Sequence, residues 1–84
     1  MPATNFHYVY LLVSEKYPDR HYTGCTLDLR ARLEMHNAGS VSHTAKFGPW
    51  RLETCTAFRS KKKARDFESY LKSGSGREFA RRHF

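Results

Sequence analysis

The spacing of apolar residues switches between the period of a strand and that of a helix, and this constrains the fold most. The segment 6–13 (FHYVYLLV) is rich in aromatic and β-branched residues, which is typical of a strand. After a turn at Ser14–Arg20, the segment His21–Cys25 predicts a second strand that pairs antiparallel with the first. Side chains alternate in character over Trp50–Phe58, which predicts a third strand.

Between the second and third strands the period becomes helical. Leu29, Arg32, Leu33 and His36 recur at spacings of three and four residues, which places them on one face of a helix. Thr26 or Asp28 could cap the start of this helix, and Asn37-Ala38-Gly39 supplies its end, with Gly39 as the C′ residue.

Two more helices follow the third strand. Ser60 is a good N-cap, so we expect a helix over Lys61–Ser73 that Gly74 ends, and then a short helix over Arg77–Phe84. The expected order is β-β-α-β-α-α, an α+β fold in which helices flank a small three-stranded antiparallel sheet. A chain of 84 residues predicts a single domain, 1–84.

The charge of the chain is strongly positive. Fifteen lysines and arginines against eight acidic residues give a net charge of +7. A small basic body attracts polyanions, because phosphates that it neutralises release their counterions. Lys61, Lys62 and Lys63 at a predicted helix start oppose the helix dipole, a local cost that a phosphate partner would relieve. The alternative is that the three lysines form a solvated face without a partner. The same two explanations apply to the basic residues of the last helix, Arg77, Arg81 and Arg82.

Several classes of protein are disfavoured. No apolar run is long enough to cross a bilayer, and the N-terminus does not resemble a signal peptide, so we expect a cytoplasmic location. Cys25 and Cys55 form neither a C-x-x-C pair nor a zinc-binding spacing with histidines. We expect both to be buried free thiols.

One carboxylate occurs where a core residue is expected. Glu68 lies beside Phe67 and three residues before Leu71, on the apolar stripe of its predicted helix. A carboxylate at such a position is costly unless it is paired, hydrogen-bonded or bound to a cation. The alternatives to a functional role are an ion pair with Lys72 or Arg82, or a position open to water.

Arg32 and His36 are also candidates for chemistry. They lie four residues apart, so their side chains share one helix face. The arginine fork matches phosphate oxygens, and histidine exchanges a proton near neutral pH. Taken alone, both residues also fit the polar edge of an ordinary amphipathic helix, and the tyrosines at 8, 10 and 22 fit a strand or an aromatic core.

Together these residues match a known pattern. Tyr8-Val9-Tyr10 resembles the GIY element and Tyr22-Thr23-Gly24 the YIG element of the GIY-YIG nuclease superfamily. Arg32 follows Tyr22 by ten residues and His36 follows by four more, which is the spacing of this family. Glu68 matches the family's metal-binding glutamate. The resemblance extends from Tyr8 to Lys72 and is that of a small stand-alone GIY-YIG domain.

The resemblance implies a metal-dependent endonuclease that hydrolyses phosphodiester bonds in DNA, in repair or recombination. Glu68 would hold Mg²⁺ or Mn²⁺, Arg32 would clamp the scissile phosphate, Tyr22 or Tyr10 would act on the attacking water, and His36 would assist proton transfer. Further candidates for contact with the nucleic acid are His43, Lys46, Lys61, Lys62 and Lys63.

Two other functions stay open. With no second domain to read bases, a nuclease of this size should favour single-stranded or structured DNA. The first alternative is a nucleic-acid-binding module that keeps the scaffold but has little catalytic activity. The second, a protein-interaction domain, predicts no salt-dependent affinity for nucleic acid.

Overall fold

The computed structural model describes residues 5–84, so residues 1–4 of the expected domain lie outside the described range. Its elements are β1 (His7–Ser14), β2 (His21–Thr26), α1 (Leu29–Asn37), the short 3-10 helix η1 (Ala45–Phe47), β3 (Trp50–Phe58), α2 (Lys61–Leu71) and α3 (Gly74–His83). This confirms the predicted α+β class and the order β-β-α-β-α-α. Within residues 5–84, no helix has the length and apolar character needed to span a membrane.

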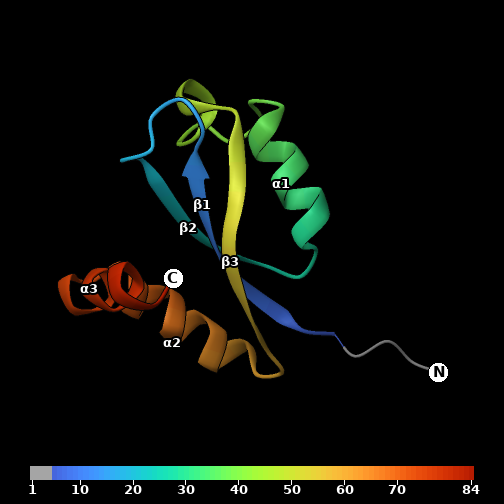
Figure 1. Cartoon of the computed structure of the whole chain (residues 1–84). Helices are drawn as coiled ribbons and strands as arrows, with labels where there is room; N and C mark the ends of the chain where they lie inside the picture. Colours follow the sequence, from blue (N-terminus) through green and yellow to red (C-terminus); the bar gives the residue numbers. More distant parts are fainter. Residues whose placement is uncertain (1–4) are drawn as a thin grey trace.

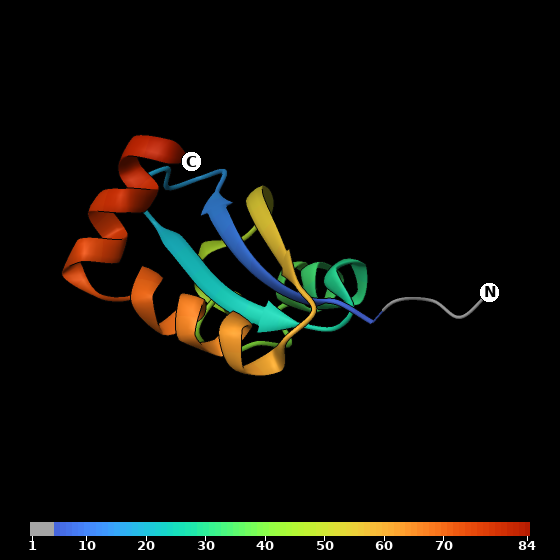
Figure 2. The ribbon, with the colours of Figure 1, turned by 90° about the horizontal axis from the view of Figure 1, so that it is seen from below.

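The sheet has the strand order β2-β1-β3, with both neighbours of β1 antiparallel to it. Figure 1 shows α1 on one side of this sheet, whereas α2 and α3 lie together on the other side. Seen from below in Figure 2, α2 (orange) runs beside β2, and α3 (red) continues towards the far end of the sheet. The central strand therefore carries buried side chains on both faces.

The face under α1 is built around aromatic residues. Tyr10, Leu12 and Trp50 form its buried cluster, and the half-buried Leu29 and Leu33 of α1 pack against it. The helix begins where the sequence predicts, because the side chain of Asp28 accepts a hydrogen bond from the Ala31 N–H. Its C-terminal end is also as predicted, with Gly39 in the left-handed region at φ 76°.

The opposite face is an ordinary apolar core. Val9, Ala64 and Leu71 are its buried residues. Half-buried aromatic side chains from β3, α2 and α3 pack against them, namely Phe58, Phe67, Phe79 and Phe84. Burying such side chains is the main favourable contribution to folding on this side.

A bulge changes the direction of side chains along β3. Leu11 pairs with Thr54 but Leu12 pairs with Leu52, so one residue of β3 is left without a partner on β1. An extra residue moves the following side chains to the other face of a sheet. Trp50 therefore packs under α1, whereas Phe58 packs under α2. The bounds predicted for this strand are confirmed, but its simple alternation is interrupted.

The predicted end of the second helix is wrong. α2 ends at Leu71, and Gly74 is the first residue of α3. The reason is Ser73, which adopts an extended conformation and whose Oγ accepts a hydrogen bond from the Gly76 N–H. Ser73 is thus the N-cap of α3, which begins three residues earlier than Arg77.

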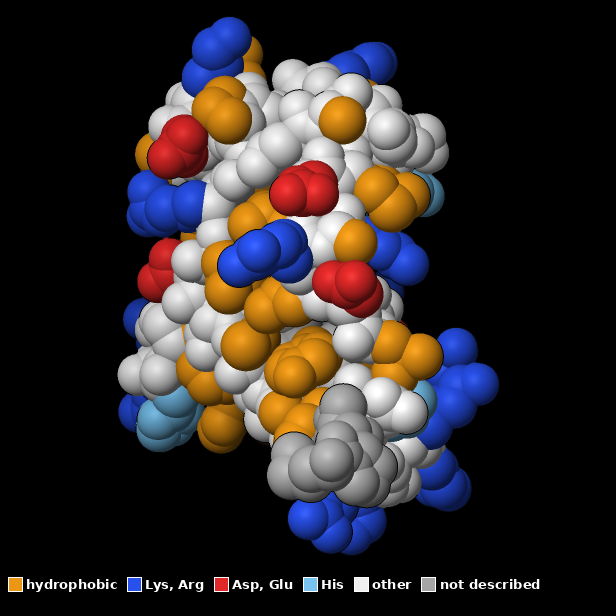
Figure 3. All heavy atoms as spheres, turned by 90° about the vertical axis from the view of Figure 1, so that its right-hand side faces the viewer, with side chains coloured by type: hydrophobic (Ala, Val, Ile, Leu, Met, Phe, Trp, Pro, Cys, Tyr) orange, Lys and Arg blue, Asp and Glu red, His pale blue; other side chains and the backbone are white. Residues whose placement is uncertain are grey.

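The burial predicted for the cysteines is wrong in part. Both thiols are free, but Cys25 is only half-buried and Cys55 is exposed. Cys55 lies on the edge strand β3, opposite Tyr10 in register and so on the α1 side of the sheet. Figure 3, which views the molecule from the α1 side, shows a band of apolar side chains that this short helix leaves uncovered.

Candidate active site

His36 is the centre of a buried hydrogen-bonded network. Its side chain is only 1% exposed. Nε2 lies 2.9 Å from the Tyr10 hydroxyl, and Nδ1 lies 2.8 Å from Oγ1 of Thr44. α1 supplies the histidine, β1 the tyrosine, and the loop before η1 the threonine. All three polar groups are therefore satisfied without water, as buried polar groups require.

The partners of Thr44 determine which ring nitrogen of His36 carries the proton. The Thr44 hydroxyl donates to the Val41 carbonyl, so it accepts from His36 Nδ1–H. Nε2 is then free to accept from the Tyr10 hydroxyl. Burial, followed by the nearby positive charge of Arg32, lowers the pKa of His36 below its usual value. At neutral pH the ring is consequently uncharged.

Gly24 on β2 makes room for Tyr10. The two residues are directly opposite in register. A Cβ atom at position 24 would lie 2.6 Å from Cζ of the tyrosine and would also overlap its hydroxyl. The tyrosine ring therefore crosses β2 at this glycine to reach His36. The close approach of the Tyr10 ring therefore explains why the YIG-like element has a glycine at position 24.

The two tyrosines of the motifs differ in their surroundings. Tyr10 is 1% exposed, and burial, together with the neighbouring Tyr22, raises its pKa to about 12 even though Arg32 opposes the shift. Tyr22 is half-buried. Its ring centroid lies 4.8 Å from that of His36 and 6.2 Å from that of Tyr10. The three rings form one cluster in which Tyr22 is the phenol with access to solvent.

Arg32 and Glu68 face one cavity from opposite sides of the sheet. The cavity has a volume of about 540 Å³, and α1 contributes Arg32 to it while α2 contributes Glu68. The connection between β2 and α1 completes its wall. Arg32 and Glu68 both act on the hydroxyl of Tyr10, since the first lowers its pKa and the second raises it. The structure thus brings the arginine, the glutamate and the tyrosine cluster together.

Glu68 also forms an ion pair. Its Oε2 lies 3.2 Å from Nζ of Lys72, one turn further along α2. This is one of the alternatives that the sequence leaves open. The carboxylate is 21% exposed and the lysine 54% exposed. Exposed pairs of this spacing contribute at most about 1 kcal/mol, so a divalent cation can displace the lysine.

The donor atoms at this cavity suit some metals and not others. Within residues 5–84, no group of three or more histidine, cysteine, aspartate or glutamate side chains is placed to hold a metal. This excludes a site enclosed by protein ligands within that range. Mg²⁺ is instead commonly held by one or two carboxylates, with water and substrate phosphate as its other ligands. Glu68, partly open to solvent in the cavity, fits that requirement.

The other residues singled out from the sequence are more scattered. Lys61 lines the cavity with Glu68. Lys62 pairs instead with Asp66, at 2.8 Å, and Lys63 is exposed. His43 is exposed on the loop that supplies Thr44, and Lys46 is exposed on η1, which follows that loop on the His36 side of the molecule.

Sequence patterns missed several residues that shape the site. Thr44 is fully buried but lies in a loop without periodicity, so no pattern indicates it. Asn37 donates to the carbonyl and accepts from the N–H of Trp50, which ties α1 to β3. Arg65 lines the cavity, and its spacing of three residues from Glu68 is a signal that could have identified it. Cys25 lines it too, and burial, followed by Glu68, raises the pKa of this thiol.

Comparison with known proteins agrees with the geometry. Residues 6–81 match the model of the GIY-YIG catalytic domain. A UPF0213 protein of Halalkalibacterium halodurans is 38% identical over 73 residues, which cover 86% of this chain and 76% of that protein. A UPF0213 protein of Streptococcus pneumoniae is 36% identical over 67 residues, 79% of this chain and 68% of that one.

A solved structure supports the same assignment. The solution NMR structure of the first of these relatives, the UPF0213 protein BH0048, there named as from Bacillus halodurans, superposes with a TM-score of 0.55 at 35% identity, covering 90% of this chain and 80% of that one. The strand and helix order described above thus occurs in a relative of similar length. The chain belongs to the GIY-YIG catalytic domain family.

Proposed function

We propose that this protein is a metal-dependent endonuclease that hydrolyses phosphodiester bonds in DNA. The observation that carries the proposal is the shared cavity of Arg32 and Glu68, next to the cluster of Tyr10, Tyr22 and His36. The guanidinium of Arg32 and the carboxylate of Glu68 converge there from opposite sides of the sheet, as phosphoryl chemistry requires. Membership of the GIY-YIG family supports a nuclease.

Arg32 and Glu68 have complementary roles in this proposal. Arg32 binds the scissile phosphate, because its planar fork pairs with two phosphate oxygens and its charge stabilises negative charge on them. Glu68 would hold Mg²⁺ or Mn²⁺ opposite the arginine. When bound, that cation supplies charge stabilisation at the leaving oxygen. Lys61 and Arg65, on the rim of the same cavity, attract the neighbouring phosphates.

Tyr10 and Tyr22 have different roles in this proposal. The hydroxyl of Tyr10 is buried and donates a hydrogen bond to Nε2 of His36. We therefore assign Tyr10 the positioning of the ring cluster and of Arg32 beside it. Tyr22 is half-exposed, and we assign it the orientation of the attacking water. His36 is neutral and holds Tyr10 in place through Nε2. This assigns one of the two tyrosines that the sequence leaves as alternatives.

The substrate follows from charge and size. A net charge of +7 on 84 residues favours a polyanion. DNA with single-stranded or branched segments is the substrate class we propose, and such an activity would serve DNA repair or recombination. A cytoplasmic location remains an expectation from the sequence.

A catalytically weak nucleic-acid-binding module is the second candidate. The ion pair of Glu68 with Lys72 favours it, because the carboxylate already has a partner. Cleavage of labelled single-stranded, branched and duplex DNA, with and without Mg²⁺ or Mn²⁺, separates the two candidates. The endonuclease predicts metal-dependent cleavage, whereas the module predicts binding without cleavage under either ion.

A matched pair of variants makes this test specific. Glu68→Gln should reduce the cleavage rate about 100-fold or more, because it removes the carboxylate that would hold the cation at the reacting phosphate. Asp66→Asn changes the other carboxylate of α2 that pairs with a lysine four residues away, but outside the cavity. It should cleave like the wild type. Equal losses in both variants, with folded proteins, would exclude a special role for Glu68.

A further inference from the structure

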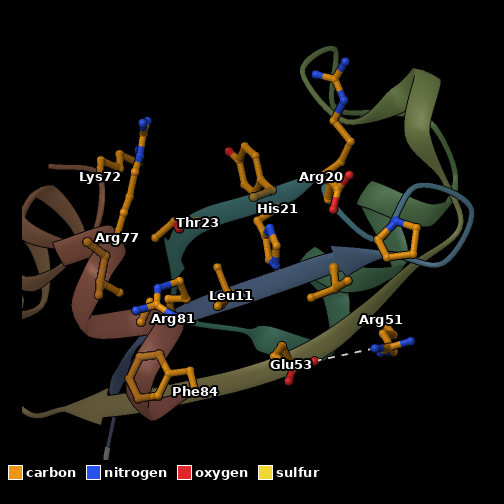
Figure 4. Close-up of a pocket in the computed structure, with 16 residues that line it drawn as sticks. Leu11, Arg20, His21, Thr23, Arg51, Glu53, Lys72, Arg77, Arg81 and Phe84 are labelled. Atoms are coloured by element: carbon orange, nitrogen blue, oxygen red, sulfur yellow. Dashed lines mark ion pairs between the residues drawn. The ribbon is translucent and has the colours of Figure 1, made fainter. Parts of the chain in front are cut away.

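A second and larger cavity lies on the sheet face that α2 and α3 leave open. It is a groove of about 990 Å³ between α3 and the turn that joins β1 to β2. Leu11 and Val13 of β1 form its floor together with Leu71, Ala80 and Phe84. Figure 4 shows basic side chains around this floor, with Arg20 at one end and Lys72, Arg77 and Arg81 towards the other.

Two of the basic side chains have no acidic partner. Arg51, Lys72 and Arg81 each pair with a glutamate. Within residues 5–84, Arg77 and Arg20 form no ion pair, and the guanidinium of Arg20 lies over the ring of Phe47, 4.4 Å from its centroid. Asp19 and Glu53 are the acidic residues of the lining, against five arginines and lysines. The groove therefore has an excess of positive charge, with one guanidinium without an acidic partner from each side.

Aromatic side chains complete the surface. Phe84 and His21 line the groove, and Tyr22 borders it with its ring packed against the Tyr10 cluster on the other face. A positively charged groove with aromatic side chains is the combination that binds single-stranded nucleic acid, because phosphates pair with the cations and unpaired bases stack on the rings. The groove has the volume of a site for a small ligand, which corresponds to a short stretch of single strand and not to a duplex.

The groove is continuous with the candidate active site at two residues. Tyr22 lines the groove, and its ring lies 4.8 Å from that of His36. Lys72 also lines the groove, and it pairs with Glu68, which lines the smaller cavity. A strand whose phosphate lies at Arg32 can thus pass Glu68 and Lys72 into the groove.

We propose that this groove binds the single-stranded segment that flanks the scissile phosphate, with Arg20 and Arg77 contacting its backbone. The inference rests on the proposed function, since it extends the path of that substrate. It explains why an apolar sheet floor is left open beside unpaired arginines. It also assigns the preference for unpaired strands to a surface away from the catalytic residues.

The test is a binding measurement without metal. The double variant Arg20→Ala with Arg77→Ala is compared with Lys16→Ala with Arg82→Ala, which removes the same charge from the same two segments outside the groove lining. Fluorescence anisotropy of labelled single-stranded DNA, single-stranded RNA and duplex DNA is recorded in EDTA over a range of salt. Circular dichroism checks that each variant is folded, and Arg77→Ala alone serves if the loss of the Arg20–Phe47 contact disturbs the turn.

The groove variant should bind single strands about tenfold more weakly than the control variant. Its salt dependence should also be shallower by about 1.4, since each lost phosphate contact contributes about 0.7 for a single strand. The DNA and RNA arms identify which backbone the groove prefers. Equal affinities of the two double variants, equal losses on duplex DNA, or no binding by the wild type would each overturn the proposal.

The result of this binding test can be interpreted whether or not the protein proves to be an endonuclease. The binding comparison is made in EDTA and needs no cleavage, so its result does not depend on the catalytic role of Glu68. Absence of cleavage in the wild type would reject the endonuclease and leave the binding comparison intact.

Discussion

The two faces of the sheet bury side chains of different chemistry. Under α1, Tyr10, His36 and Thr44 are buried and joined by hydrogen bonds. Under α2 and α3, Val9, Ala64 and Leu71 are buried with phenylalanine side chains and no such network. Both faces stabilise the sheet, and the first also fixes the orientation of the buried Tyr10 and His36.

The difference indicates how a chain of this size combines stability with function. An apolar core tolerates exchange of residues of similar volume. A hydrogen-bonded core does not, because a buried polar group left without its partner costs about 1–3 kcal/mol. We therefore expect changes in the apolar core under α2 and α3 to alter stability alone. Changes in the hydrogen-bonded core under α1 should alter both stability and the proposed chemistry.

The largest effect is expected from Gly76→Ala on the apolar side. A Cβ there would overlap the backbone of Tyr70 and lie 2.6 Å from the Cα of Leu71. Backbone atoms cannot move aside as a side chain can, so α3 must shift relative to α2. Chemical denaturation should show a loss of about 3 kcal/mol in the free energy of unfolding.

The control for this change is Gly74→Ala in the same helix. A Cβ at position 74 meets no atom within 4 Å, so this variant should be as stable as the wild type or slightly more stable. In Gly76→Ala the imidazole NMR signals of His36 should keep their chemical shifts. A marked change in them would contradict the independence of the two faces.

A smaller loss of stability is expected from Gly24→Ala on the α1 side. The new methyl group overlaps the ring of Tyr10, which is a side chain and can rotate away at a cost of about 2 kcal/mol. Rotation breaks the hydrogen bond to His36, so the His36 signals should shift and cleavage should fall together. Unchanged His36 signals in a destabilised variant would show that the glycine serves packing only.

The smallest effect concerns the pH dependence of stability. The pKa of folded His36 is lowered, so the unfolded chain takes up the proton first as the pH falls below about 6.5. The unfolded state then binds more protons, and this contribution to stability is present above that pH and is lost below it. Denaturation of the wild type and of His36→Gln at pH 7 and pH 5 measures the contribution.

The stability advantage of the wild type over His36→Gln should shrink between pH 7 and pH 5. An advantage that stays constant, or that grows at pH 5, would mean that burial and the charge of Arg32 do not keep the histidine neutral.

Local patterns in the sequence were sufficient for most of the fold. The alternation over Trp50–Phe58 and the caps at Asp28, Gly39 and Ser60 depend on neighbouring residues, and they predicted the bounds of β3 and the ends of α1 and the start of α2. Ser73 shows where such patterns conflict, because its role as a cap outweighs the usual reading of the glycine after it.

The site depends on contacts that no local pattern encodes. Thr44 meets His36 through a loop, and the bulge in β3 sends Trp50 and Phe58 to different faces. The family resemblance identified Arg32 and Glu68 as partners because it carries information on distant pairs. Periodicity alone assigns them to two helices and gives no information on how close they lie to each other.

The central claim is that Glu68 holds a divalent cation in the cavity that it shares with Arg32. Titration of Mn²⁺ into isotopically labelled protein, followed by paramagnetic broadening of backbone amide signals, tests it without reference to cleavage. Signals of residues 26–28, 32 and 68 should broaden first in the wild type and in Asp66→Asn, but not in Glu68→Gln. Broadening that begins elsewhere, or that survives in Glu68→Gln, would contradict the claim.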